Sequence, residues 1–70
     1  MLTDLHKMYG KWSTANIRVR LRNDRERLKW WKTKTTQLHH KAEGIQLYSD
    51  HIRAMEIILT ARRELRGKAA

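Results

Sequence analysis

The stretch that decides the fold runs Ile17-Arg18-Val19-Arg20-Leu21-Arg22-Asn23-Asp24-Arg25-Glu26-Arg27-Leu28. Its first half alternates strictly between a branched aliphatic residue and arginine. In an extended strand this alternation places Arg18, Arg20 and Arg22 on one face and the aliphatic residues on the other. Asn23 can then cap a helix, with Glu26 three residues later where a capping box requires it. We therefore predict a short basic strand that leads directly into a helix.

A helix competes with this strand over residues 17–22, because the alternation is too short to decide the period. Apolar residues across a much longer segment also fall on one helical stripe, apart from two polar interruptions: Ile17, Leu21, Leu28, Trp31, Leu38, Ala42 and Ile45. On this alternative the chain is an all-α helical hairpin. The two interpretations differ at Arg20, which in a helix lies on roughly the opposite side from Arg18 and Arg22.

Around this stretch we expect one small domain with an extension at each end. Residues 1–16 form an N-terminal amphipathic extension with a short helix, because their apolar residues recur at helical spacing. Residues 17–66 form the single small helical domain, and residues 67–70 a frayed tail. A chain of 70 residues without cysteine has a marginal core. We therefore expect support from a partner chain or a larger assembly.

Two longer helices are expected within this mainly α domain. The first covers residues 24–42 and ends before Gly44, since glycine is preferred just past a helix end. A turn there leads to a last helix over residues 49–65, for which Ser49 or Asp50 is a favourable cap. This helix is the most apolar, so we predict that it is the most buried, through one shared face: Ile52, Met55, Ile58, Leu59 and Leu65.

The charge of the chain indicates a polyanionic partner. Sixteen Lys and Arg against seven Asp and Glu give a formal net charge of +9 on 70 residues. The cations are concentrated in the middle of the chain, where the candidate nucleic-acid contacts are Arg18, Arg20, Arg22, Arg25, Lys29, Lys32 and Lys34. Trp30 lies among these lysines and is a candidate for stacking on an unpaired base. Its neighbour Trp31 is on the apolar stripe and is expected in the core.

The order of these elements resembles the ribbon-helix-helix family of DNA-binding proteins. Residues 18–24 are similar to that family's strand and helix entry, and residues 44–54 to its turn and the start of its second helix. The resemblance covers about residues 17–60 and leaves the N-terminal extension without a counterpart.

This resemblance implies an obligate homodimer. Two copies of residues 17–22 would pair as an antiparallel ribbon whose aliphatic side chains face the helices. Arg18, Arg20 and Arg22 would then point into a DNA major groove, as in other β-ribbon proteins. An arginine side chain is suited to this groove because it can bond guanine O6 and N7 together.

The sequence argues against several other kinds of site. Without cysteine there is no disulfide or thiolate metal site, and His39 with Glu43 four residues later supplies only two ligands, so we expect no metal and no cofactor. No nucleophile has a base beside it and no glycine-rich phosphate loop is present. We therefore expect no catalytic residues, no small-molecule substrate and no enzymatic activity. No apolar run is long enough to span a bilayer, and we expect an intracellular protein.

Three functions are compatible with these patterns. The favoured one is a small nucleic-acid-binding protein, a dimeric regulator or accessory factor that binds DNA or, less favoured, RNA. The first alternative is a basic helical structural subunit of a large assembly, such as a ribonucleoprotein or a multi-subunit complex. The second alternative is an inhibitor or adaptor that binds an acidic protein surface.

Overall fold

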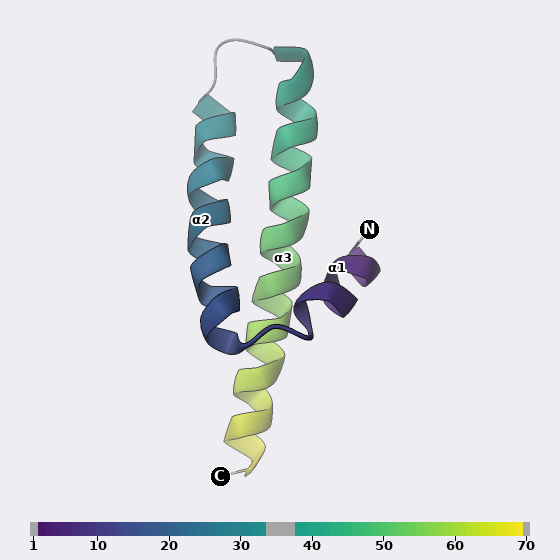
Figure 1. The fold of residues 1–70 in the computed structure, drawn as a ribbon, viewed down its shortest axis with the longest axis vertical. Helices are drawn as coiled ribbons and strands as arrows, with labels where there is room; N and C mark the ends of the chain where they lie inside the picture. The colour runs from purple at the N-terminus through teal and green to yellow at the C-terminus, as the bar shows by residue number, and fades with distance from the viewer. Residues whose placement is uncertain (1, 34–37, 70) are drawn as a thin grey trace.

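The computed structural model describes residues 2–33 and 38–69, which form three helices (Figure 1). Helix α1 spans Leu2–Tyr9, α2 spans Thr14–Thr33 and α3 spans Leu38–Ala69. Helices α2 and α3 lie side by side in opposite directions, and α1 packs against the lower half of α3 in the view of Figure 1. The described residues contain no strand, which confirms the all-α helical hairpin rather than the strand-containing fold.

The predicted strand over residues 17–22 is wrong, because these residues lie within α2. Ile17 and Leu21, four residues apart, are buried together, whereas Val19 between them is 58% exposed. Spacing by four places two residues on one side of a helix, and here that side faces α3. The paired ribbon implied by the family resemblance cannot form from residues that are helical.

Helix α2 also begins earlier than predicted. Its cap is Ser13, whose hydroxyl accepts a hydrogen bond from the Asn16 amide at 3.1 Å. The amide of Ile17 donates to the Ser13 carbonyl at 3.0 Å, which closes the first turn. Asn23, the predicted cap, is an exposed residue in the middle of the helix. The connection from α1 is therefore only the short segment 10–13.

The predicted helix boundary and turn at Gly44 are wrong as well. Helix α2 ends at Thr33 rather than at residue 42, and Gly44 lies inside α3. Gly44 is buried because the Trp31 indole of α2 lies directly over it. A Cβ atom at Gly44 would lie 2.5 Å from Cε2 and 2.8 Å from Cε3 of Trp31. Glycine is present here because its lack of a side chain lets the two helices approach, and not because it ends a helix.

Helix α3 is one continuous element in place of the predicted turn and last helix at 49–65. Its 32 residues span about 48 Å at roughly 1.5 Å per residue, which matches the 49 Å length of the molecule. The last turns of α3 extend past the start of α2 (Figure 1). Leu65, predicted on the buried face, is therefore 67% exposed. The predicted frayed tail at 67–70 is helical as far as Ala69.

The core lies where the three helices meet. Its buried residues come from every helix: Tyr9, Ile17, Leu21, Ile52, Ala54 and Met55. Partly buried apolar side chains surround this cluster: Leu5, Trp12, Leu28, Ile58 and Leu59. The predicted apolar face of the last helix is thus confirmed for Ile52 and Met55, and Ile58 and Leu59 lie at the edge of the core.

Gly44→Ala should lower the thermal stability of the protein, although alanine is favoured over glycine in a helix by about 1 kcal/mol. The added methyl group overlaps the Trp31 indole, and overpacking of this kind costs about 1–3 kcal/mol. Thermal unfolding followed by circular dichroism measures the change. In a Trp31→Leu background the same substitution should be neutral or stabilising. An equal loss of stability in both backgrounds would contradict the close contact.

Candidate nucleic-acid interface

Most of the predicted contact residues line one side of α2. Successive spacings of four and three residues keep them on one face of a helix with 3.6 residues per turn. These residues, which we call the basic stripe, are Arg18, Arg22, Arg25, Lys29 and Lys32, and all of them are exposed. From its first to its last residue the stripe runs about 21 Å along the helix axis, at roughly 1.5 Å per residue.

Acidic side chains neutralise little of the basic stripe. Arg25 Nη2 lies 3.4 Å from Glu56 Oε2, and both side chains are exposed, so that water screens the ion pair. Within the described part of the chain no other member of the stripe has an acidic partner. Glu26 lines a pocket with Arg18, Arg22 and Arg25 but forms no ion pair with them within the described part of the chain, so the stripe stays predominantly positive.

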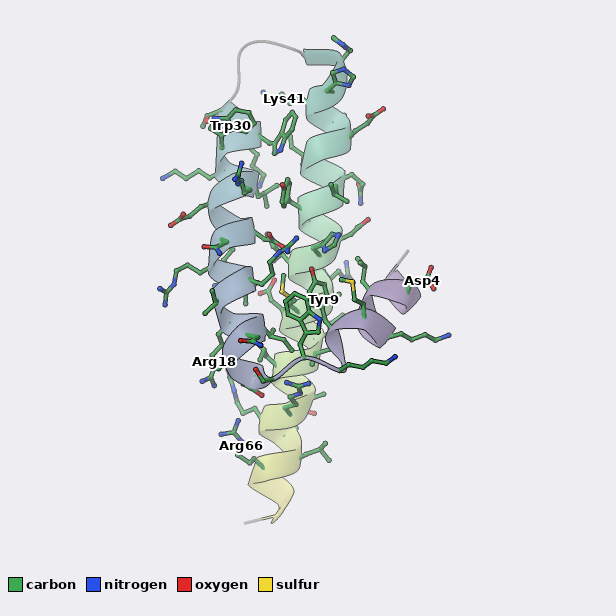
Figure 2. All side chains as sticks on the ribbon, viewed as in Figure 1. Asp4, Tyr9, Arg18, Trp30, Lys41 and Arg66 are labelled. Carbon is green, nitrogen blue, oxygen red and sulfur yellow. The ribbon has the colours of Figure 1, made fainter. Side chains whose placement is uncertain are left out.

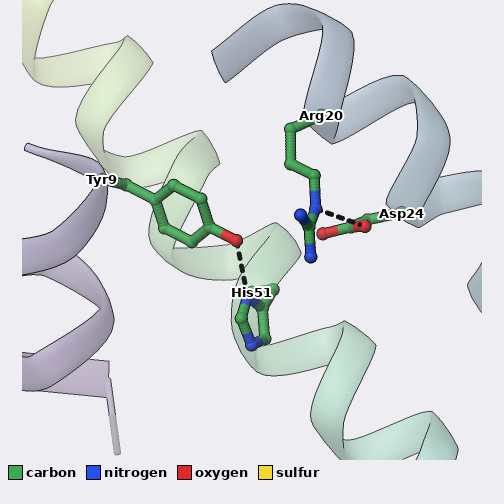
Figure 3. A network of polar contacts seen from close by, with 4 residues as sticks. All are labelled: Tyr9, Arg20, Asp24 and His51. Carbon is green, nitrogen blue, oxygen red and sulfur yellow. Dashed lines mark hydrogen bonds and ion pairs between the residues drawn. The ribbon is translucent and has the colours of Figure 1, made fainter. Parts of the chain in front are cut away.

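Arg20 lies apart from the stripe and is held by a buried acid. Its Nε donates to Asp24 Oδ1 at 2.9 Å within α2. Asp24 is only 2% exposed, and its Oδ2 has no hydrogen-bond partner among the described residues. The predicted trio Arg18, Arg20 and Arg22 is therefore not one outward face, because Arg20 points to Asp24 and away from the stripe, although its side chain stays 43% exposed (Figure 3).

A second polar contact beside this ion pair joins α1 to α3 (Figure 3). The Tyr9 hydroxyl and His51 Nδ1 are 2.6 Å apart, and their rings meet edge to face with centroids 5.6 Å apart. We call these two residues together with Arg20 and Asp24 the polar centre. Tyr9 has no exposed surface, so a substrate cannot reach its hydroxyl. The polar centre is thus a structural contact between helices and not an acid–base pair open to chemistry.

Burial shifts the pKa of both members of the Tyr9–His51 contact. Desolvation lowers the pKa of His51 below its ordinary value, and the charge of Asp24 opposes this shift. Desolvation also raises the pKa of Tyr9, which the charge of Arg20 opposes and that of Asp24 reinforces. His51 is therefore neutral at neutral pH, and its Nδ1 can accept a hydrogen bond from the Tyr9 hydroxyl.

Trp30 and Lys34 complete the predicted set. Lys34 lies outside the described residues. Trp30 is 51% exposed and meets Trp31 edge to face, with ring centroids 5.1 Å apart. Together with Asn23, Glu26 and Arg27 it lines an open pocket. Helical geometry places it about 120° round α2 from the middle of the basic stripe, so one nucleic-acid strand cannot follow the stripe and stack on Trp30 across the same face.

The structure adds basic residues that we did not assign to the site from the sequence. Arg63 and Arg66 near the end of α3 lie beside Thr14 and Arg18 at the start of α2. With Leu59 they line a pocket of about 150 Å³. The spacing of three residues between the two α3 arginines indicates a shared face. Only the antiparallel hairpin, however, brings that face to Arg18.

The histidines do not gather into a metal centre in the described ranges. The rings of His39 and His40 have centroids 4.0 Å apart, and His40 Nδ1 lies 3.9 Å from Glu43 Oε2. No three potential ligands come together among the residues that the structure describes. In the same ranges, no helix has both the length and the apolar character that crossing a membrane requires.

Arg20→Ala should destabilise the fold, because it leaves the buried Asp24 carboxylate without its cation. The expected cost is about 1–3 kcal/mol, measured by urea unfolding. Arg27→Ala is the matched control, since Arg27 is exposed on the same helix and should change stability by less than about 0.5 kcal/mol. The double variant Arg20→Met/Asp24→Leu should recover much of the loss. Equal effects of the two single alanine variants would contradict the structural role of Arg20.

Stability should fall as the pH drops below about 6.5, the ordinary pKa of histidine. Because the pKa of His51 is lowered in the folded protein, the unfolded chain takes up the proton first on acidification. The contribution of neutral His51 is thus fully present above that pH and is lost below it. Urea midpoints on both sides of this pH measure the effect.

His51→Gln is the control for this titration. The glutamine side chain does not titrate, and its oxygen can still accept a hydrogen bond from the Tyr9 hydroxyl. This variant should lose markedly less stability on acidification than the parent protein. If it loses as much, the titrating group is not His51.

Comparisons with protein-family models, with curated proteins and with solved structures found no match to this chain.

Proposed function

We propose that this chain binds nucleic acid through the phosphate backbone, with the basic stripe as its contact surface and duplex DNA as its favoured ligand. The observation that supports this proposal is the alignment of Arg18, Arg22, Arg25, Lys29 and Lys32 on one exposed side of α2. Neutralising phosphates with such cations releases condensed counterions, which provides affinity without sequence recognition.

The length of the stripe suits a phosphate backbone. Duplex DNA carries one negative charge about every 1.7 Å along its helix axis, so the roughly 21 Å of the stripe is long enough to contact several phosphates. The major groove of B-form DNA is about 12 Å wide and admits a helix, whereas that of A-form RNA is deep and narrow. Duplex DNA is therefore favoured over duplex RNA.

The basic stripe provides affinity for phosphates and does not provide the base recognition expected of the arginine trio in the ribbon interpretation. Arg20 is engaged with Asp24, and the strand that would have carried the trio is helical. A role as a regulator or accessory factor remains within this proposal, but it no longer depends on a paired ribbon between two copies of the chain.

We infer a binding role rather than catalysis from the same geometry. The closest hydroxyl–histidine pair of the described chain is Tyr9 with His51, and the hydroxyl lies in the core. The residues of the stripe are exposed cations. Their common feature is positive charge, which favours binding of an extended anion.

A basic subunit of a large assembly is the second candidate, and the outer side of α3 favours it. Ile57, Ala61 and Leu65 are spaced by four residues on this side, and all three are exposed. Light scattering of the isolated chain separates the candidates. A folded monomer that binds DNA favours the first, and a poorly folded or self-associating chain favours the second.

Arg22→Gln should weaken DNA binding and reduce its dependence on salt. Losing one phosphate contact lowers the slope of log affinity against log salt by about 0.9 for duplex DNA. Fluorescence anisotropy with a labelled duplex, from about 50 to about 200 mM salt, measures the slope. Arg53→Gln removes the same charge from an exposed site of α3 outside the stripe, and it should have a smaller effect.

Two results would contradict the proposed function. The first is an absence of binding to duplex DNA and to structured RNA even at low salt. The second is an equal loss of affinity in Arg22→Gln and Arg53→Gln, because it would show that net charge alone, and not the stripe, determines binding.

A further inference from the structure

Three arginines converge on one pocket where α2 begins and α3 ends. Arg18 lines the pocket from α2, Arg63 and Arg66 line it from α3, and Thr14 and Leu59 complete the lining. The pocket measures about 150 Å³. Figure 2 shows Arg18 and Arg66 reaching to the same side at this end of the molecule.

The positive charge of these three arginines is not compensated. A guanidinium group remains protonated at any physiological pH, and none of the three has an acidic partner among the described residues. Two acids at this end of α3, Glu56 and Glu64, line a different pocket with Ile57, Thr60 and Ala61. Like charges that share a pocket repel one another, and a bound anion would remove this repulsion.

The neighbouring Arg62 holds the two walls of the pocket together. Its Nη1 donates to Thr14 Oγ1 at 2.9 Å, and its Nη2 donates to the Trp12 carbonyl at 2.8 Å and the Gly10 carbonyl at 3.2 Å. These bonds tie the start of α2 to α3. The Thr14 hydroxyl accepts from Arg62, so its own hydrogen can still be donated to a ligand.

We propose that this pocket binds a single phosphate group of the nucleic acid. Guanidinium groups form paired hydrogen bonds with phosphate oxygens, and Thr14 supplies a hydroxyl donor beside them. Arg18 is also the first residue of the basic stripe. A nucleic-acid strand that is bound along the stripe therefore continues into the pocket. The inference that the pocket binds phosphate depends only on the residues that line it. The inference that this phosphate belongs to a nucleic acid rests on the proposed function.

Inorganic phosphate is the probe for the pocket itself. The full chain, labelled with ¹⁵N, is titrated with phosphate while chloride keeps the ionic strength constant. We expect saturable shifts at the Thr14 amide and at the arginine Nε signals of the pocket. The double variant Arg63→Gln/Arg66→Gln should lose them, and Arg53→Gln should keep them. Shifts that do not saturate, or that are equal at all arginines, would overturn the proposal that the pocket binds phosphate.

A DNA titration tests whether the arginines act on one phosphate. If they do, Arg63→Gln, Arg66→Gln and the double variant each lower the salt slope by about the same amount, roughly 0.9. Two independent contacts would instead double the change in the double variant. All of these side chains are exposed, so the variants should fold. If circular dichroism shows that the double variant is unfolded, the double variant Arg18→Gln/Arg66→Gln is compared with its two single variants in the same way.

The two titrations separate this inference from the proposed function. If Arg22→Gln lowers the salt slope and the pocket variants do not, phosphate binding by the pocket is overturned and the proposed function stands. If phosphate saturates the pocket but neither DNA nor RNA binds, the pocket stands and the proposed function falls. The ligand would then be a phosphorylated molecule other than a nucleic acid.

Discussion

The Arg62 side chain of α3 fixes the segment between α1 and α2 against α3. One guanidinium group bonds the Gly10 and Trp12 carbonyls and the Thr14 hydroxyl, and each bond to a charged group contributes about 1.5–3 kcal/mol. Helix α1 has only eight residues and is too short to be stable by itself. By holding the segment after α1 against α3, Arg62 keeps both Tyr9 and the Ser13-capped start of α2 close to α3.

The position of α2 then determines which arginines face outward. Its inward side carries Asp24 as well as Ile17 and Leu21, and a buried carboxylate requires a cation beside it. Arg20 supplies that cation from the preceding turn. One arginine of the alternating stretch is thus paired with this buried acid, and the basic stripe consists of residues that the polar centre does not use.

Much of this fold could be predicted from the sequence, but the deciding details are tertiary. Ile17 and Leu21 fit both a strand and a helix, and only the exposure of Val19 separates the two. The five residues of the stripe follow from their spacing once the helix is known. Gly44 could not be assigned from local rules, because its role is the contact with Trp31. Arg63 and Arg66 join the site only through the antiparallel packing of α2 and α3.

Arginines at the end of a helix have an ordinary explanation, since they complement the negative end of the helix dipole. That explanation accounts for the presence of arginines near the C-terminus of α3, but not for the side of the helix on which Arg63 and Arg66 lie. Arg63 and Arg66 face Arg18 and the positive end of α2 across one pocket, whereas Glu56 and Glu64 line another. For folding alone this arrangement is unfavourable, because it concentrates like charge. An anion in the pocket makes the same arrangement favourable, and this difference is the physical argument for a ligand there.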